Sequence, residues 1–375
     1  MRTWNTLTRA SCLCSLAFAA IQPHEEKGEV QLLNQCQANL NEVDTNEYTK
    51  EADCGTQTNE ENDRVLPANT PKSATVYFAR HAKSMWNDET SKSILLKMHL
   101  EFKHGRIEKY EHLKDAVLAE EGLQSAITVR DQLKAKCESS QKAKEGKTDF
   151  TDDICFLVKG HPDRDMKTLF VTSNLRRAIL TALILFKNRI LLTNGAQGKI
   201  ERILIHSALQ EISKNTDSIP ITPKDHIPHL KFAVSDEQGT CPFPQDVMKN
   251  LFALACDNAD ENNSAPQAQT RRDRIERFCE WMRNEVTKHG VENIVIVGHS
   301  IWLRQLFQKY TQPTSGILKY LGKMVGMYLE DKVASSLRIL SNDGILKFTV
   351  NVDETTCTIL RGETHIINGK ISIRR

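Results

Sequence analysis

The feature that most constrains the fold is an alternation of short apolar runs with longer helical patterns from residue 73 onward. The apolar runs are 74–79, 168–172, 202–206 and 293–297. Each is apolar nearly throughout, as in strands of a parallel sheet that is covered on both faces. Helical patterns occupy 122–137, 174–189, 271–288 and 302–310. This alternation predicts an α/β fold with a mostly parallel central sheet.

Two segments depart from the alternation. Residues 335–340 and 346–352 are separated by Ser-Asn-Asp-Gly, which predicts a C-terminal hairpin appended to the sheet. Residues 212–265 are irregular and contain five prolines, so we interpret them as an insertion over one face of the sheet.

The net formal charge of +2 hides segments of opposite sign. Residues 24–72 carry 4 bases against 11 acids, and residues 73–375 carry 44 bases against 37 acids. The acidic stretch is too polar to offset the entropy of folding, which predicts a disordered linker. The near balance of the whole chain argues against a nucleic-acid binder that works by bulk charge.

The first 23 residues leave three interpretations open: a secretory signal, a mitochondrial presequence or an unprocessed terminus. Residues 10–21 are apolar and follow two arginines, but this run is too short to form a stable membrane span. Without a targeting role the default location is the cytoplasm. The ten cysteines form no C-x-x-C motif, and Cys155 and Cys279 lie in apolar runs, where reduced core thiols are expected.

Polar residues follow each of the four predicted strands. The first runs into Arg80 and His81, the second leads to Arg177, the third to Glu211 and the fourth to His299. The carboxyl ends of parallel strands form one edge of the sheet, where ligands bind in open α/β folds. We therefore expect these side chains to converge on one crevice.

This set of residue types suits phosphoryl transfer. Guanidinium groups match the oxygens of a phosphate group bidentately and stay charged. An imidazole can carry a phosphoryl group covalently and pass it to water. The carboxylic acid of Glu211 can protonate the leaving oxygen and later activate water, provided that burial raises its pKa. Arginines supply the positive charge in this chemistry, so the prediction includes no metal and no cofactor.

Four motifs carry a family resemblance. Residues 80–87 (RHAKSMWN) resemble the R-H-G-E-S-x-W-N motif of the histidine phosphatase superfamily, also called phosphoglycerate mutase-like. Residues 115–126, 173–181 and 297–304 are similar to its D-x-x-L-T-x-x-G-x-x-Q-A, S-x-L-x-R-A-x-x-T and G-H-S-x-x-x-R segments. The resemblance implies a three-layer α/β/α fold. The order of its motifs also favours one domain over 73–375, and the composition of 1–72 predicts a possible targeting segment followed by the acidic linker.

The resemblance implies a role for each matched position. His81 corresponds to the phosphorylated nucleophile, Arg80 to a phosphate clamp and Arg177, rather than Arg176, to the second arginine. The remaining assignments are Glu211 as proton donor, His299 as the second histidine, and Asn87 and the backbone N–H of Ser300 as phosphate contacts. The substrate is then a phosphorylated small molecule or a phosphoprotein.

The sequence departs from the family pattern at two places. Ala82 and Lys83 stand where the family commonly has Gly and Glu, and we expect Lys83 to favour an anionic substrate. Residues 88–94 (DETSKSI) do not match the segment that follows W-N in glycolytic mutases. Hydrolysis of phosphate monoesters is therefore favoured over mutase chemistry, and both remain open.

Other functions are weighed against this one. A catalytically weak scaffold of the same fold that binds a phosphorylated ligand stays open. The run 298–302 (GHSIW) has a tryptophan at the last glycine of the G-x-S-x-G elbow of α/β-hydrolases, which argues against a serine hydrolase. His226 and His229 have no Cys or acid at metal-ligand spacing, so a surface loop is the better account of them.

Overall fold

The computed structural model describes only part of the chain. The chain divides into two units, residues 1–64 and 65–375, and every described residue belongs to the second unit. The described residues are 72–93, 112–143, 153–160, 167–190, 202–213, 215–221, 251–255, 271–311, 333, 338–353, 355–360 and 362–373. The predicted targeting segment, nearly all of the predicted acidic linker and much of the predicted insertion therefore lie outside the described residues.

The four predicted strands form the centre of one sheet. They are β1 (Lys72–Arg80), β2 (Thr168–Ser173), β3 (Ile203–His206) and β5 (Asn293–Gly298). These strands run parallel, in the order β3-β2-β5-β1. Arg80 pairs with Gly298, and Ser173 pairs with His206, so the strands end together at one edge. The prediction of a mostly parallel sheet is confirmed.

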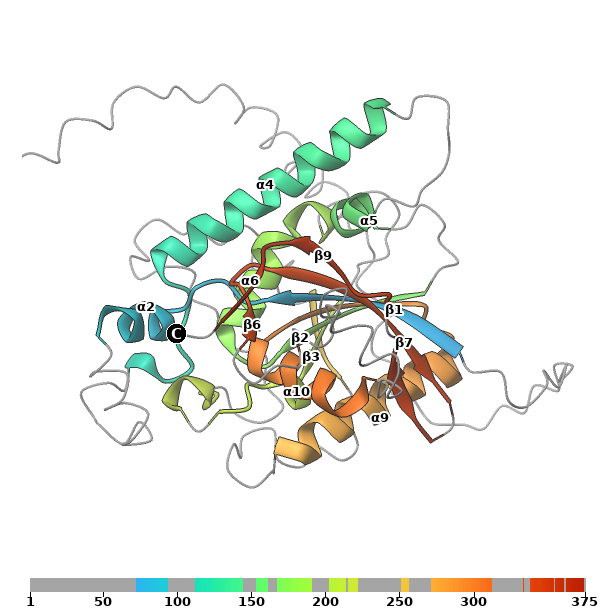
Figure 1. Cartoon of the computed structure of the whole chain (residues 1–375). Coiled ribbons are helices and arrows are strands. Elements are labelled where there is room, and N and C mark those ends of the chain that lie inside the picture. The colour runs from blue at the N-terminus through green and yellow to red at the C-terminus, as the bar shows by residue number, and fades with distance from the viewer. Residues whose placement is uncertain are drawn as a thin grey trace, which may run out of the picture. The chain divides into compact units, whose positions relative to one another are not determined.

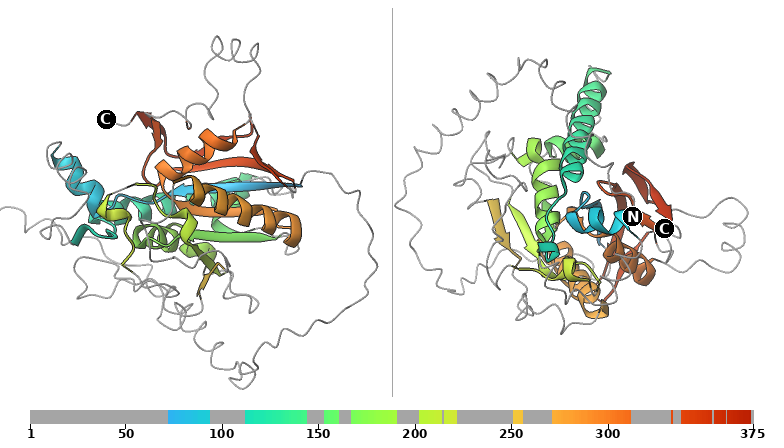
Figure 2. Two further views of the ribbon diagram at one scale, coloured as in Figure 1. Left: turned by 90° about the horizontal axis from the view of Figure 1, so that it is seen from below. Right: turned by 90° about the vertical axis from the view of Figure 1, so that its left-hand side faces the viewer.

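Helices cover both faces of this sheet. On one side are α4 (Glu120–Ala143), α5 (Asp153–Lys159) and α6 (Arg176–Leu185), and on the other are α9 (Arg271–His289) and α10 (Ser300–Tyr310) (Figures 1 and 2). Side chains alternate along β1, so Tyr77 belongs to the core under α4–α6 and Phe78 to the core under α9 and α10. The α/β/α layering thus follows from strands that are apolar on both faces.

A helix that the sequence analysis did not predict follows β1. Helix α2 (Met85–Lys92) begins with a reciprocal cap in which the amide N–H of Asn87 donates to Ser84 Oγ and the backbone N–H of Ser84 donates to Asn87 Oδ1. Only Trp86 among its residues is buried, so the apolar periodicity is too weak to mark it. In Figure 1 the helix extends beyond the carboxyl end of β1.

The start of α4 is joined to the loop between β1 and α2. The N–H of Ala119 donates to Lys83 O at 3.0 Å, and the N–H of Met85 donates to Val117 O at 2.9 Å. A Cβ on Gly122 would lie 2.0 Å from Lys83 O, so only glycine allows this approach. The glycine of the D-x-x-L-type segment therefore has a packing function beside the loop that follows His81.

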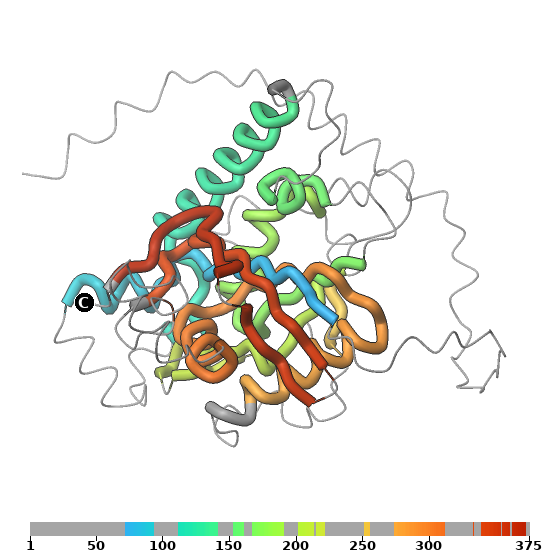
Figure 3. Tube along the Cα trace, turned by 45° about the vertical axis from the view of Figure 1, so that its right-hand side comes forward, coloured from blue at the N-terminus to red at the C-terminus, as the bar shows by residue number. Residues whose placement is uncertain are grey.

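The predicted pairing of 335–340 with 346–352 is wrong, although a C-terminal hairpin is present. Strand β6 (Arg338–Leu340) pairs with β10 (Ile371–Ile373), while β7 (Ile345–Val352) pairs with β1 and forms a hairpin with β8 (Cys357–Ile359). Strand β9 (His365–Asn368) also pairs with β7, and Figure 3 shows β7 beside β1. The turn before β7 holds Asp343 at φ 54°, and β6 pairs in a separate two-stranded sheet.

The predicted insertion contains ordered elements. Strand β4 (Phe252–Leu254) extends the parallel sheet beyond β3, and the 3₁₀ helix η3 (Thr216–Ser218) follows Glu211. A strand of three residues is too short to produce a readable pattern, which explains why it was missed. That the rest of 212–265 is an insertion in one domain stays a prediction.

One expected thiol is oxidised. Cys155 is in a disulfide with Cys137 that joins α5 to α4, whereas Cys279 is a buried free thiol as expected. The reduced-thiol prediction for Cys155 is therefore wrong, because its apolar surroundings do not reveal that a second cysteine faces it. Within the described ranges no helix is long and apolar enough to cross a membrane.

Candidate active site

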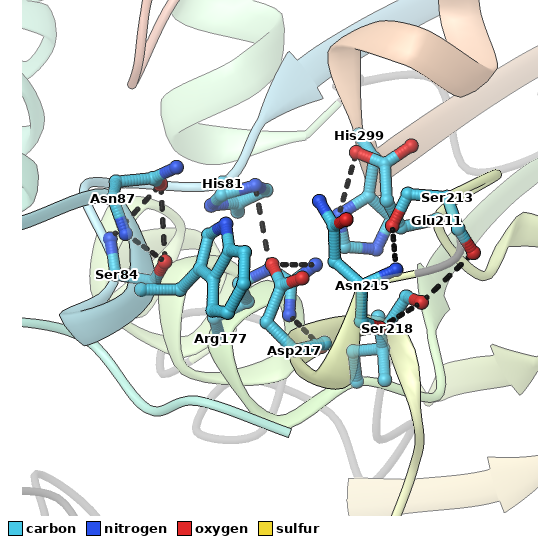
Figure 4. Close-up of polar contacts among 12 residues, drawn as sticks. His81, Ser84, Asn87, Arg177, Glu211, Ser213, Asn215, Asp217, Ser218 and His299 are labelled. Carbon is cyan, nitrogen blue, oxygen red and sulfur yellow. Dashed lines mark hydrogen bonds and ion pairs between the residues drawn. The ribbon is translucent and has the colours of Figure 1, made fainter. Parts of the chain in front are cut away.

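The predicted site residues lie together at the carboxyl edge of the sheet (Figure 4). His81 directly follows β1, and Arg177 lies in the first turn of α6 after β2. Glu211 follows the 3₁₀ helix η2 (Ser207–Leu209) that ends β3, and His299 is the N-cap of α10 after β5. The convergence results from parallel strands whose ends share one edge.

His81 is buried with one ring nitrogen committed to the backbone. Its Nδ1 lies 2.7 Å from Ala82 O, and a carbonyl oxygen only accepts, so Nδ1 carries the hydrogen. Nε2 therefore presents a lone pair. Burial lowers the pKa of His81 well below its ordinary value, and the charges of Arg177 and Arg80 lower it further. The ring is therefore neutral at physiological pH.

Arg177 is fully buried against this lone pair. Its Nε donates to His81 Nε2 at 3.4 Å, and its Nη1 donates to Asp217 O at 2.5 Å. Arg176 instead donates its backbone N–H to Asp115 Oδ1 and its guanidinium to Asp115 O. The two neighbours thus have separate surroundings, and the one beside His81 is Arg177, as the sequence predicts.

Arg80 is the last residue of β1 and contacts the C-terminal part of the chain. Its Nη1 donates to Leu340 O at 2.6 Å, and its backbone N–H donates to Gly344 O at 2.9 Å. The C-terminal turn between β6 and β7 therefore contacts this arginine. Its charge contributes to lowering the pKa of both His81 and His299.

His299 lies beside His81, and Glu211 lies beside His299. The rings of His81 and His299 have centroids 5.0 Å apart, and His299 Nε2 shares a hydrogen bond of 2.9 Å with Ser173 Oγ. Burial lowers the pKa of His299 well below its ordinary value. Glu211 Oε2 lies 4.0 Å from His299 Nδ1, and burial raises the pKa of Glu211. A raised pKa favours the protonated acid that a proton donor requires.

The predicted phosphate contacts differ in their surroundings. Ser300 is the buried first residue of α10, where backbone N–H groups have no helical partner. Asn87 uses its Oδ1 in the cap of α2. Lys83 pairs with Asp88 at 2.8 Å and with Glu121 at 2.5 Å on the outer side of the loop. The role of each in binding phosphate stays a prediction.

Three further residues support the site and were not singled out from the sequence. Ser173 contacts His299, and Thr181 Oγ1 accepts from the N–H of Ala82 at 3.0 Å, which ties α6 to the loop after His81. Both belong to the S-x-L-x-R-A-x-x-T segment, so their positions in the motif could have identified them. Asp217 contacts Arg177, but no sequence signal marks it.

No group of three or more His, Cys, Asp or Glu residues that could hold a metal ion occurs among the described residues. His226 and His229 lie outside them. In the predicted chemistry, Arg80 and Arg177 supply the positive charge that phosphoryl transfer requires.

Comparisons with known proteins give structural matches alone. No protein-family model matches the chain, and no curated protein matches it. Phosphoglycerate mutase from Bacillus anthracis matches with 14% identity and TM-score 0.34, over 78% of this chain and 93% of that chain. Phosphoserine phosphatase from Entamoeba histolytica matches with 13% identity and TM-score 0.31, over 78% and 96%.

The ecdysone phosphate phosphatase from Bombix mori matches with 12% identity and TM-score 0.35, over 80% of this chain and 97% of that chain. Two of these three proteins are named phosphatases, and the third is named a mutase.

Proposed function

We propose that this protein is a phosphatase that hydrolyses phosphate monoesters through a covalent phosphohistidine on His81. The observation that carries the proposal is the state of the His81 ring. Its Nδ1 is bound by Ala82 O, and its Nε2 lone pair lies beside the buried Arg177 guanidinium. A neutral imidazole beside fixed positive charge is suited to attack a phosphate group.

In the first step, the Arg177 Nε–H leaves His81 Nε2 and donates to a phosphoryl oxygen instead. The freed Nε2 lone pair forms a bond to phosphorus while the bond from phosphorus to the ester oxygen breaks. The leaving oxygen takes the proton of the Glu211 carboxylic acid. In the second step, the Glu211 carboxylate takes a proton from water, and the water oxygen attacks phosphorus. The N–P bond breaks, which returns His81 to its neutral form and releases inorganic phosphate.

The two arginines stabilise the charge on the phosphoryl oxygens in both steps. Arg177 lies in α6 and Arg80 at the end of β1, and the charges of both contribute to lowering the pKa of the two histidines. Phosphoryl transfer requires chiefly positioning and positive charge at these oxygens. His299, held by Ser173, adds a neutral donor or acceptor near the same group.

The test is turnover of a chromogenic phosphomonoester by the full chain, together with trapping of an acid-labile phosphoenzyme. We expect His81→Ala to abolish both signals. The control is His365→Ala, on an exposed residue of β9. A His81→Ala variant with full activity would refute the nucleophile, and a wild-type chain without turnover would favour the ligand-binding scaffold. Formation of the 2-isomer from 3-phosphoglycerate with a bisphosphate primer would favour the mutase.

A further inference from the structure

A buried carboxylate contacts the arginine that faces the proposed nucleophile. Asp217 is 5% exposed, and its Oδ2 lies 3.3 Å from Arg177 Nη2. The backbone oxygen of the same residue accepts from Arg177 Nη1. Figure 4 shows Asp217 next to Arg177. The phosphatase mechanism above assigns no role to this carboxylate.

The fold holds Asp217 in this place. It lies in η3, whose last residue, Ser218, receives a hydrogen bond of 2.6 Å from Gln210 Nε2 through its backbone oxygen. Ser218 Oγ donates in turn to Asn215 O at 2.7 Å. Gln210 directly precedes Glu211, so one short segment supplies both the proposed proton donor and the carboxylate on Arg177.

Contacts with the protein use several of the N–H donors of Arg177. A guanidinium has five N–H groups. Nε faces His81, one N–H of Nη1 faces Asp217 O, and Nη2 is ion-paired with the Asp217 carboxylate. A phosphate group that binds Arg177 must therefore share the guanidinium with the negative charge of Asp217.

We propose that Asp217 is a positioning residue that orients the Arg177 guanidinium and also limits the affinity of the site for inorganic phosphate. The inference rests on the proposed function, because it concerns release of the product of that reaction. Its physical basis is repulsion between two anions on one buried cation, which is weakly screened where water is excluded. The same negative charge contributes to raising the pKa of Glu211.

The test compares inorganic phosphate binding to the wild-type chain and to Asp217→Asn by calorimetry. Asparagine keeps the backbone carbonyl and an acceptor oxygen near Nη2, so it removes the charge with little change in shape. We expect phosphate to bind between about tenfold and a hundredfold more tightly. The control is Asp131→Asn, which removes an equal charge from an exposed ion pair with Arg130 and should leave the affinity unchanged.

Tighter binding is the diagnostic result, because damage to an anion site weakens binding. Unchanged or weaker phosphate binding in Asp217→Asn overturns the inference. If that variant loses its cooperative unfolding transition, Asp217→Ser is measured in its place under the same criterion. A wild-type chain that binds phosphate without turnover refutes the proposed function alone. A variant with normal turnover and unchanged phosphate affinity refutes this inference alone.

Discussion

Replacing Gly122 by alanine should damage stability and activity together. The added Cβ would lie 2.0 Å from Lys83 O, and that oxygen would have to move to at least 3.4 Å for an ordinary contact. Backbone cannot rotate away as a flexible side chain can, so either the start of α4 or the loop after His81 must shift. The loop also carries the capping residue Ser84 of α2.

Two opposing effects determine how much Gly122→Ala changes the free energy of unfolding. Alanine in place of glycine inside a helix gains about 1 kcal/mol from helix propensity. Overpacking of this kind costs about 1–3 kcal/mol, and a backbone contact lies toward the upper end. The expected net loss is about 1–2 kcal/mol in the free energy of unfolding. For activity, a displacement of about 1 Å at a catalytic group can lower the rate about a hundredfold.

The assay is chemical unfolding of Gly122→Ala, with turnover of the phosphomonoester measured on the same preparation. The control is Gly290→Ala. Gly290 has φ +66° and nothing near its Cβ position, and it lies before β5, at the opposite end of that strand from His299. The control should lose stability from its positive φ while turnover stays normal. A Gly122→Ala variant with wild-type stability and turnover would refute the packing argument.

Three further predictions follow from named contacts. Arg177→Lys should lower kcat/KM by about a hundredfold or more, because one ammonium group cannot replace the guanidinium contacts. Arg176→Lys, at the arginine that contacts Asp115, should retain most activity. Equal losses in the two variants would contradict the assignment of Arg177. Burial raises the pKa of Asp343 to about 6, so the fold favours the protonated form of this carboxyl group. Its contribution to stability is fully present below about pH 4 and is lost as the pH rises through 6. Asp343→Asn should therefore gain up to about 3 kcal/mol relative to wild type between about pH 4 and pH 8 in urea unfolding, and a pH-independent difference would count against it. Reduction, or Cys155→Ala, should lower the unfolding free energy by about 3 kcal/mol because the disulfide with Cys137 spans 18 residues; unfolding that is insensitive to a reductant would show that the bond is absent.

The α/β architecture was readable because strands buried on both faces require continuous apolar runs. All four predicted runs are strands of the central sheet, and their order along the chain places His81 and His299 after paired strands. The side chains predicted to converge do lie together, although their catalytic roles stay predictions. Chain order suffices here because parallel strands end at a common edge.

The strand pairing of β6 and the disulfide partner of Cys155, which the sequence did not predict, both join segments that only the folded chain brings together. Strand β6 is adjacent to β7 in sequence, yet it pairs with β10, because β7 already pairs with β1, β8 and β9. Local turn signals cannot show which edges of a strand are already occupied. The partner of Cys155 was missed for a similar reason, since α4 and α5 meet only in the folded chain.

The amino-acid sequence by itself determined the layers of the fold and the residues offered at its carboxyl edge, because both depend on local periodicity and on the position of each strand end. Only the tertiary structure decided which atoms meet there. The division of Arg177 donors and the presence of Asp217 beside them depend on distances between segments that packing brings together, and the tautomer of His81 depends on the local geometry that holds its Nδ1 against Ala82 O. Such contacts leave no periodic signal, because each is made once, by atoms whose positions only the folded chain fixes.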